Sequence, residues 1–214
     1  MLVGNKSDNT LYDLDGDDSL DGGKAADHLD GDTGVNTSSY ASSTKKVQVD
    51  LETNINSGGY AKGDTLTGDA DANALDGGAG NDTLVGRFGA DTLTGGAGND
   101  VLSGGGSDDW VFNAPLSASS NVDSITDFVL GGDDIVLDNA IFTLVGPTGE
   151  LAAAAFASNA SGSAAENAQV RIIHDQSSGR LYYDADGNGT GSAAHFATLD
   201  TRPADLAATD ILVS

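Results

Sequence analysis

Between residues 59 and 112, the sequence places an oxygen-bearing side chain at every ninth position and an apolar side chain two residues further on. Glycine opens each nonapeptide, beginning with Gly59. The sixth positions are Asp64, Asn73, Asp82, Asp91, Asp100 and Asp109. The eighth positions are Leu66, Leu75, Leu84, Leu93, Leu102 and Val111. Carboxylate and amide oxygens in a regular row are suited to binding a hard cation such as calcium.

A fixed nine-residue period indicates a solenoid of stacked turns. Apolar residues at this spacing cannot form the apolar face of a helix, so each repeat has room only for a short strand around its leucine. The glycines supply the turns, because they adopt positive φ angles without strain. Two nonapeptides would complete one turn, which divides the sixth positions between two edges: Asp64, Asp82 and Asp100 on one, and Asn73, Asp91 and Asp109 on the other. We therefore predict an all-β fold, a right-handed parallel β-roll that buries a ladder of leucines.

Rows of carboxylates about 4.8 Å apart would repel one another strongly unless cations lay between them. Calcium fits best, because it accepts several oxygen ligands in flexible geometry, including backbone carbonyls. Magnesium tends to retain its waters, and zinc prefers nitrogen and sulfur, which this chain scarcely offers. The alternative is a metal-free glycine-rich solenoid with solvated acidic edges. The registered repeats favour the calcium-binding interpretation, with several ions bound.

The hexapeptide Gly-Gly-Ala-Gly-Asn-Asp occurs at residues 77–82 and again at 95–100. These repeats resemble the RTX, or hemolysin-type, calcium-binding nonapeptides. The resemblance implies that sixth-position side chains bridge ions between turns, and that carbonyls of the second and fourth positions complete the ligand shell. The implied carbonyl donors are Gly78, Gly80, Gly89, Gly96 and Gly98. We expect the tightest sites near Asp82, Asp91 and Asp100, where the consensus is followed most closely.

A looser version of the same pattern fills residues 1–39, with Asp18 and Asp27 as further candidate ligands. Asn9 and Asn36 hold the other sixth positions of this block. An amide offers one uncharged oxygen, so these two positions predict weaker calcium sites.

Residues 40–58 interrupt the nonapeptide register. The alternation of polar and apolar side chains in residues 47–51 predicts a half-exposed strand. Lys45 and Lys46 precede this strand, and two lysines favour a solvated turn over a nucleic-acid site. We interpret residues 40–58 as a β-rich insert that joins two repeat blocks.

Residues 113–214 follow the repeats and are expected to cap the open end of the roll with a β-rich region. Alternating apolar runs predict strands at residues 123–128, 133–138, 141–145, 170–173 and 180–183, the last two as a hairpin. An alanine-rich run predicts a short helix over residues 148–158. Residues 210–214, acidic and then apolar, resemble type I secretion signals and also suit a final strand.

Residues 184–189 read Asp-Ala-Asp-Gly-Asn-Gly and resemble the start of an EF-hand loop. The twelfth position of such a loop requires glutamate and is His195 here, and a strand rather than a helix precedes the loop. A tight hairpin turn is the better interpretation, with an additional calcium site left open. His28, His174 and His195 stand in different elements without paired spacing. We expect His28 to be a surface residue rather than a ligand, and the His174-Asp175 dipeptide to be structural.

The chain of 214 residues carries a net charge of −24 at pH 7 and contains no cysteine. This charge argues against nucleic acid and anionic membrane surfaces as partners, and without cations it favours disorder. The sequence has no apolar run of membrane-spanning length and no N-terminal signal segment, so we expect no membrane insertion and either a longer parent protein or an export signal elsewhere. We expect a monomer stabilised by calcium in place of disulfides.

Catalytic signatures such as His-Glu-x-x-His and Gly-x-Ser-x-Gly do not occur, so we expect no enzymatic activity. The favoured function is a calcium-binding module of an exported bacterial protein that passes through the type I secretion apparatus unfolded and folds outside the cell on binding calcium. One alternative is a calcium-stiffened structural or adhesive segment of a surface protein. Another is an accessory module of a secreted polysaccharide-acting enzyme, although the few basic residues argue against binding acidic glycans.

Overall fold

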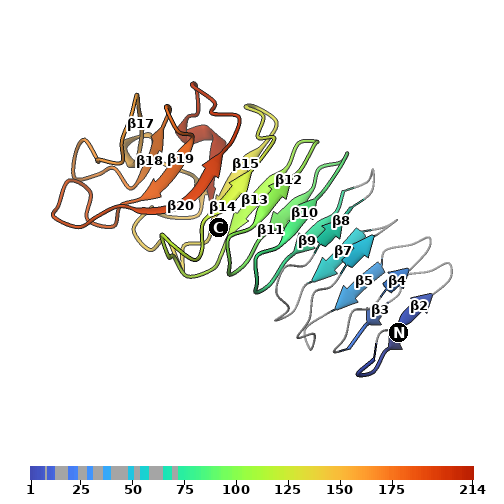
Figure 1. Cartoon of the computed structure of the whole chain (residues 1–214). Coiled ribbons are helices and arrows are strands. Elements are labelled where there is room, and N and C mark those ends of the chain that lie inside the picture. Colours follow the sequence, from blue (N-terminus) through green and yellow to red (C-terminus); the bar gives the residue numbers. More distant parts are fainter. Residues whose placement is uncertain are drawn as a thin grey trace.

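The computed structural model describes residues 1–7, 9–12, 19–23, 28–30, 36–39, 48–50, 54–57, 65–68 and 72–214. Short strands stack from the N-terminus toward a broader C-terminal region (Figure 1). The helices of the described residues are two short 3-10 segments, η1 (Ala153–Ala155) and η2 (Ala208–Asp210). Neither of them, nor any other described segment, is a helix long and apolar enough to cross a membrane.

Most strands belong to two large sheets. The first has ten strands, in the order β1 (Leu2–Val3), β3 (Ser19–Asp21), β5 (Asn36–Ser39), β7 (Asn54–Ser57), β9 (Ala74–Asp76), β11 (Thr92–Thr94), β13 (Asp109–Phe112), β15 (Asp134–Leu137), β21 (Ile211–Val213) and β16 (Gly149–Glu150). The second has nine, in the order β17 (Phe156–Asn159), β18 (Ile172–Asp175), β19 (Arg180–Tyr183), β20 (Ala194–Leu199), β14 (Asp123–Ile125), β12 (Val101–Ser103), β10 (Thr83–Val85), β8 (Thr65–Thr67) and β6 (Gln48–Asp50). A separate pair joins β2 (Thr10–Tyr12) to β4 (His28–Asp30).

Parallel strand pairing follows the predicted period of two nonapeptides per turn. Leu84 lies in register with Leu66 on one side and Leu102 on the other, each 18 residues away. On the opposite sheet, Leu93 pairs with Leu75 at the same separation. From β5 to β15, odd-numbered strands therefore lie in one sheet and even-numbered strands in the other, and the predicted parallel β-roll is confirmed.

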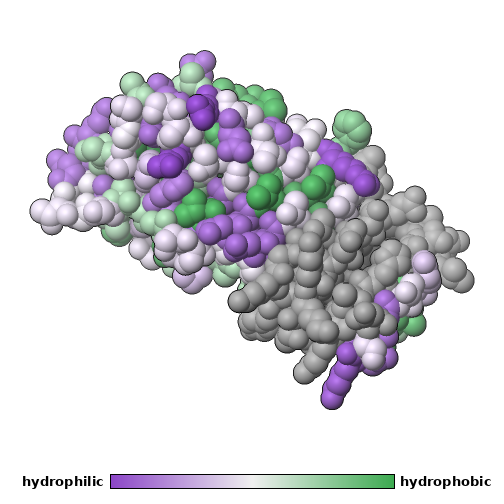
Figure 2. All heavy atoms as spheres, in the orientation of Figure 1, coloured by the Kyte–Doolittle hydropathy of each residue, from purple (hydrophilic) through white to green (hydrophobic). Residues whose placement is uncertain are grey.

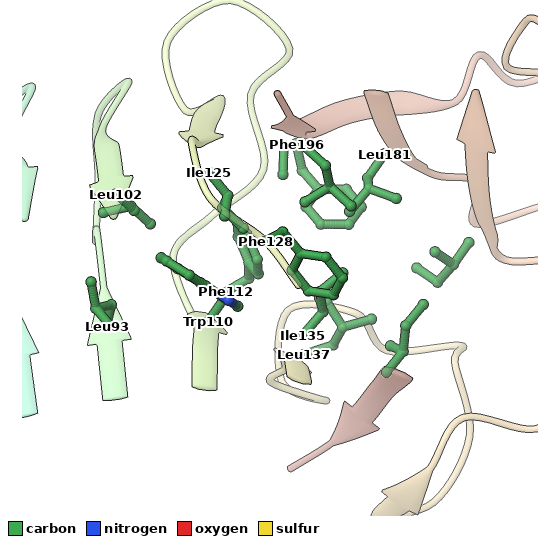
Figure 3. Packing of buried hydrophobic residues seen from close by; sticks show 14 of the residues in the cluster. Leu93, Leu102, Trp110, Phe112, Ile125, Phe128, Ile135, Leu137, Leu181 and Phe196 are labelled. Atoms are coloured by element: carbon green, nitrogen blue, oxygen red, sulfur yellow. The ribbon is translucent and has the colours of Figure 1, made fainter. Parts of the chain in front are cut away.

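The leucines of the roll form a continuous core that runs into the C-terminal cap (Figure 3). Leu84 and Leu93 are fully buried, and so is Trp110 at the junction with the cap. Beyond it, the rings of Phe112 and Phe196 meet edge to face with centroids 5.1 Å apart. Roll and cap thus share one apolar core.

The visible surface of the described residues is largely hydrophilic or weakly polar, with scattered apolar side chains (Figure 2).

The last repeat departs from the predicted register by one residue. Trp110, not Val111, pairs with Leu93 and fills the core position, because the preceding turn is one residue shorter than in the other repeats. Phe112 then points inward as well, and Val111 is only half-buried. The shorter turn therefore places two large aromatic side chains in the core where the roll meets the cap.

Within residues 40–58, the described strands β6 and β7 belong to the roll through their pairing. β7 pairs with β5 and β9, and β6 pairs with β8, so both sheets continue past the break in the sequence pattern. Ser38 and Asn56 align with the leucine ladder in this region, which explains why the hydrophobic signal fades there. The strand predicted within residues 47–51 is confirmed as β6, while the predicted domain boundaries remain predictions.

The cap matches some expectations and corrects others. β14, β15, β21 and the antiparallel hairpin of β18 and β19 confirm predicted strands. The helix predicted over residues 148–158 is wrong, because β16 pairs with β21 and β17 pairs with β18, leaving only η1 between them.

The strand predicted over residues 141–145 is also wrong. This segment forms turns in which the Phe142 amide donates to the Asp138 carbonyl at 2.9 Å and the Val145 amide donates to the Phe142 carbonyl at 3.2 Å. The turns bury Phe142 and Val145 together, although the alternation in the sequence suggested opposite faces of a strand.

Candidate metal-binding edges

Three aspartates stack along the edge of the roll that leads into β10, β12 and β14. The backbone amide of Asp82 donates to Oδ1 of Asp100 at 2.7 Å, and the amide of Asp100 donates to Oδ1 of Asp123 at 3.1 Å. All three side chains are at least 95% buried, with 1%, 1% and 5% of their surface exposed. The carboxylates of Asp100 and Asp123 thus each contact the turn that precedes their own.

An equivalent stack lines the opposite edge, before β9, β11, β13 and β15. The amide of Asn73 donates to Asp91 Oδ1 at 2.8 Å, and the amide of Asp91 donates to Asp108 Oδ1 at 2.9 Å. The amide of Asp108 then donates to Asp133 Oδ1 at 3.0 Å. Four buried oxygen-bearing side chains therefore follow one another from the roll into the cap.

Asp108 holds the position that sequence analysis gave to Asp109. Asp108 is 2% exposed and accepts the Asp91 amide, whereas Asp109 is exposed at the start of β13. The shortened turn accounts for the difference, because it moves the last aspartate of the ladder one residue earlier. Asp108 therefore takes the place in the buried stack that the nonapeptide register predicted for Asp109, and which of the two binds calcium remains a prediction.

Sequence analysis missed Asp123 and Asp133, which continue the two stacks beyond the repeats. Their signal was an aspartate two residues before a buried apolar side chain, as in Asp100 with Leu102. Asp123 precedes Ile125 in this way, and Asp133 precedes Ile135. The glycines that reveal the period are missing here, so the sequence pattern places the two residues only within predicted strands.

Stacked carboxylates without a cation are electrostatically unfavourable. Burial raises the pKa of Asp123 to about 8, and the neighbouring carboxylate of Asp100 adds to this increase. Burial also raises the pKa of Asp100, Asp108 and Asp133. In the part of the chain that the structure describes, Oδ2 of Asp100 is buried without a hydrogen-bond partner. A buried carboxylate oxygen with no partner is suited to a cation.

At particular glycine positions, the turns that carry these aspartates have no room for a side chain. A Cβ atom on Gly77 would lie 2.8 Å from Oδ2 of Asp82 and 2.7 Å from the Gly95 carbonyl oxygen. All the glycines predicted to supply carbonyl ligands have positive φ angles: Gly78 at 83°, Gly80 at 146°, Gly89 at 137°, Gly96 at 91° and Gly98 at 157°. The glycine pattern thus allows the backbone to approach both the carboxylates and the next turn.

The two edges fit calcium better than a metal held only by side chains. No three histidine, cysteine or acidic side chains of the described residues converge on one point. The carboxylates are instead spread along each edge, so a bound ion must take further oxygen ligands from the backbone or water. Calcium accepts such mixed oxygen sets, whereas a structural zinc site needs converging nitrogen or sulfur ligands.

Other candidate positions fall outside these stacks or outside the described residues. Asp18, Asp27 and Asp64 lie outside the described residues and remain predictions. In the loop between β19 and β20, Oδ1 of Asp184 accepts the Asp186 amide at 3.2 Å, and Oδ2 of Asp186 accepts the Gly191 amide at 2.9 Å. β19 and β20 pair antiparallel, so a hairpin is present, but its connection spans residues 184–193 and is longer than the tight turn that the sequence predicted.

Together, the parallel roll and its two rows of buried carboxylates define a metal-binding β-solenoid. A family model for the RTX calcium-binding nonapeptide repeat matches residues 3–37, 59–93 and 85–114 and counts four copies. The chain therefore contains RTX repeats, which bind calcium, and several repeats imply several ions. The repeats are a structural calcium-binding module, and Asp123 and Asp133 lie beyond the matched residues.

Among solved structures, the chain is similar to the AlgE6R3 subunit of the mannuronan C5-epimerase from Azotobacter vinelandii, determined in solution. The two share 28% sequence identity over 72% of this chain and 80% of that chain, with a TM-score of 0.46. This likeness is too distant to support an argument, and the fold assignment rests on strand pairing. No curated protein matches the chain.

Proposed function

We propose that this chain is a calcium-dependent folding module of an exported protein, in which ions bound along both edges of the roll stabilise its stacked turns. The observation that carries the proposal is the pair of buried carboxylate stacks, with the unpartnered Oδ2 of Asp100 among them. Burial of so many acidic groups costs free energy, and calcium offsets this cost by neutralising them.

The proposed side-chain ligands follow the two stacks. They are Asp82, Asp100 and Asp123 on one edge, and Asn73, Asp91, Asp108 and Asp133 on the other. Carbonyls of Gly78, Gly80, Gly89, Gly96 and Gly98 would supply further oxygens. Because Asp123 and Asp133 belong to the cap, bound calcium would also join the cap to the roll.

Calcium binding and folding are coupled in this proposal. The unfolded chain spreads its charge of −24 over a large volume, whereas the folded roll concentrates acidic groups on two edges. A ligand that binds only the folded state stabilises it in proportion to the logarithm of its concentration. Extracellular calcium sites typically have dissociation constants of about 10⁻⁴–10⁻³ M, so folding would await the exterior of the cell.

The C-terminus would serve as the signal for type I secretion. Residues 211–213 form β21, in which Ile211 and Val213 are buried between β15 and β16. A transporter could reach this segment only before the cap folds. Low calcium inside the cell would therefore keep the signal accessible, and calcium outside would bury it after export.

Calcium binding by EDTA-stripped protein, measured by isothermal titration calorimetry, tests the ligand assignment. We expect the double variant Asp123→Asn, Asp133→Asn to bind fewer ions than the unmodified chain, because it loses one carboxylate from each stack. The matched control is Asp200→Asn, another cap aspartate, which lies outside both stacks. Unchanged binding in the double variant would remove the cap from the calcium sites.

The secretion part of the proposal has its own test. When the chain is produced together with a type I secretion apparatus, we expect deletion of residues 210–214 to abolish export. Deletion of residues 1–3 serves as the control and should leave export intact. Equal export of both deletions would contradict the C-terminal signal without affecting the calcium sites.

A further inference from the structure

The cap contains a histidine that the calcium sites do not use. His174 lies in β18 with none of its side chain exposed. Its Nδ1 atom lies 3.1 Å from Oγ of Ser158 on the neighbouring strand. Its other ring nitrogen, Nε2, is buried and has no hydrogen-bond partner among the described residues. Such a ring is accommodated only when neutral, because a buried imidazolium would need acceptors at both nitrogens.

The histidine belongs to a small polar network that links three parts of the cap. Nε2 of Gln176 donates to Oγ of Ser158 at 3.1 Å and to the carbonyl of Ala204 at 3.0 Å. The network thus connects β17, β18 and the segment that leads through η2 into β21. Leu181 of β19 lies in register with His174, so the remaining surroundings of the ring include apolar side chains.

Few charged groups could compensate a proton on this ring. On β18, Asp175 is the adjacent acidic residue, and its carboxylate already accepts bonds from Ser177 and Ser178. β17 carries no ionisable side chain, and β19 carries Arg180, which aligns with Asp175, and two tyrosines. The segment bonded to Gln176 carries Asp205 one residue beyond Ala204. Burial lowers the pKa of His174, and the charge of Asp175 opposes this effect.

We infer that His174 makes the cap an acid-sensitive unit, whose fold requires a neutral ring and opens when the ring takes up a proton. Opening would break the contacts of Ser158 and Gln176, which hold β17 and the segment before β21 to β18. The unfolded chain accepts a proton with the ordinary histidine pKa of about 6.5. Acid therefore favours the open cap, and the ratio of open to closed cap rises up to about tenfold for each pH unit below about 6.5.

This sensitivity is separate from the calcium sites and has the opposite sign to that of the metal-free carboxylate stacks. Protonation relieves repulsion among buried carboxylates, whereas it places an uncompensated charge in the cap core at His174. The cap would therefore stay closed at neutral pH and loosen in acidic surroundings.

Thermal unfolding at saturating calcium between pH 7.5 and 5 tests this inference. Acid also weakens calcium binding in every variant, so the informative quantity is the difference between the chain and His174→Gln or His174→Leu at each pH. We expect the unmodified chain to lose more stability than either variant below about pH 6.5. Burial also lowers the pKa of His195, but its ring is only half-buried and its Nε2 contacts the Ala197 carbonyl at 2.9 Å, which opposes this effect. The control His195→Gln should therefore remove a smaller part of the slope than the His174 variants do.

Equal pH dependence of the chain and its His174 variants would overturn the inference, as would an equal effect of His195→Gln. If the variants do not fold, a measurement on the unmodified chain still tests the inference. Ring nitrogen chemical shifts from NMR should show His174 neutral in the folded protein throughout the pH range, titrating only as the cap opens. Reversible titration of this ring within an intact cap would contradict the inference.

Discussion

Adjacent aspartates at the end of the roll differ sharply in environment. Asp108 is buried within the acidic stack, whereas its neighbour Asp109 is exposed on β13. Their identical chemistry makes the pair a controlled comparison of position. The shortened turn, rather than the residue type, determines which of the two carboxylates lies in the buried stack.

We predict that Asp108→Asn weakens calcium binding about tenfold at the affected site, since one charged ligand becomes a neutral one. Asp109→Asn should leave affinity within about twofold, because an exposed carboxylate outside the stack contributes little. Calorimetric titration of both variants measures the difference. The corrected register is wrong if Asp109→Asn proves the more damaging change.

A second prediction concerns pH in the absence of calcium. Burial raises the pKa of the stacked carboxylates, to about 8 for Asp123, so the folded state holds protons that the unfolded state releases. Stability is therefore lowest above about pH 8 and increases as the pH falls toward the unfolded-state value near 3.8. We expect the folded fraction in EDTA to rise between pH 8 and 6.5, above the range in which His174 titrates.

Circular dichroism of EDTA-treated protein, with an osmolyte added to populate the folded state, measures this trend. The same measurement in calcium should reverse its sign, because protons then compete with the ions for the carboxylates. If the folded fraction of the metal-free protein falls between pH 8 and 6.5, repulsion among the stacked carboxylates does not destabilise the folded state.

The turns set the spacing that brings the carboxylates into register. Gly86 illustrates the constraint, since a Cβ atom there would collide with Oδ2 of Asp91 and lie 2.9 Å from the Gly104 carbonyl oxygen. Gly132, in the cap, has its nearest neighbour at 3.4 Å from the same hypothetical atom. Neither glycine has a positive φ angle, so the comparison isolates crowding from backbone preference.

We therefore predict that Gly86→Ala destabilises the calcium-bound protein by roughly 1–3 kcal/mol, the usual cost of overpacking. Gly132→Ala should change stability by less than about 0.5 kcal/mol, as is typical of substitutions with room to spare. Urea unfolding at fixed calcium concentration compares the two. Equal effects would mean that the turns tolerate side chains beside the carboxylates.

The predictability of each element from sequence depended on whether its interactions were local and repeated. The period predicted the strands around Leu66 to Leu102, because every repeat has the same neighbours. The period predicted Val111 instead of Trp110 at the core position, since the loss of one turn residue becomes visible only from the strand pairing. Residues 148–158 were predicted as a helix because their local composition is alanine-rich. The strands that pair with β16 and β17, which are β21 and β18, come later in the sequence and leave no local signal.

The candidate site was predictable to a similar extent. Asp82, Asp91 and Asp100 were found because glycines mark their turns, and the structure places all three in buried stacks. Asp123 and Asp133 reach the same stacks from the cap, through turns with different lengths and no repeated glycine motif. Recognising them required the three-dimensional register of β14 and β15 with the strands of the roll.

On the scale of the whole molecule, the roll and the cap form one continuous structure. Both large sheets run from the repeats into the cap (Figure 1). The apolar ladder passes through Trp110 to the rings of Phe112 and Phe196 (Figure 3). The carboxylate stacks follow the same path and end at Asp123 and Asp133. Because each turn contacts mainly its neighbours, ordering of one turn by calcium should favour ordering of the next.

Calcium titration of EDTA-stripped protein, followed by far-ultraviolet circular dichroism and Trp110 fluorescence, tests the central claim most directly. Trp110 is the only tryptophan and is fully buried where roll meets cap, so its emission reports folding of the junction. We predict a cooperative gain of β-structure and a blue shift of emission at sub-millimolar to millimolar calcium, with no such change in magnesium. A protein that is fully folded in EDTA and indifferent to calcium would contradict the account.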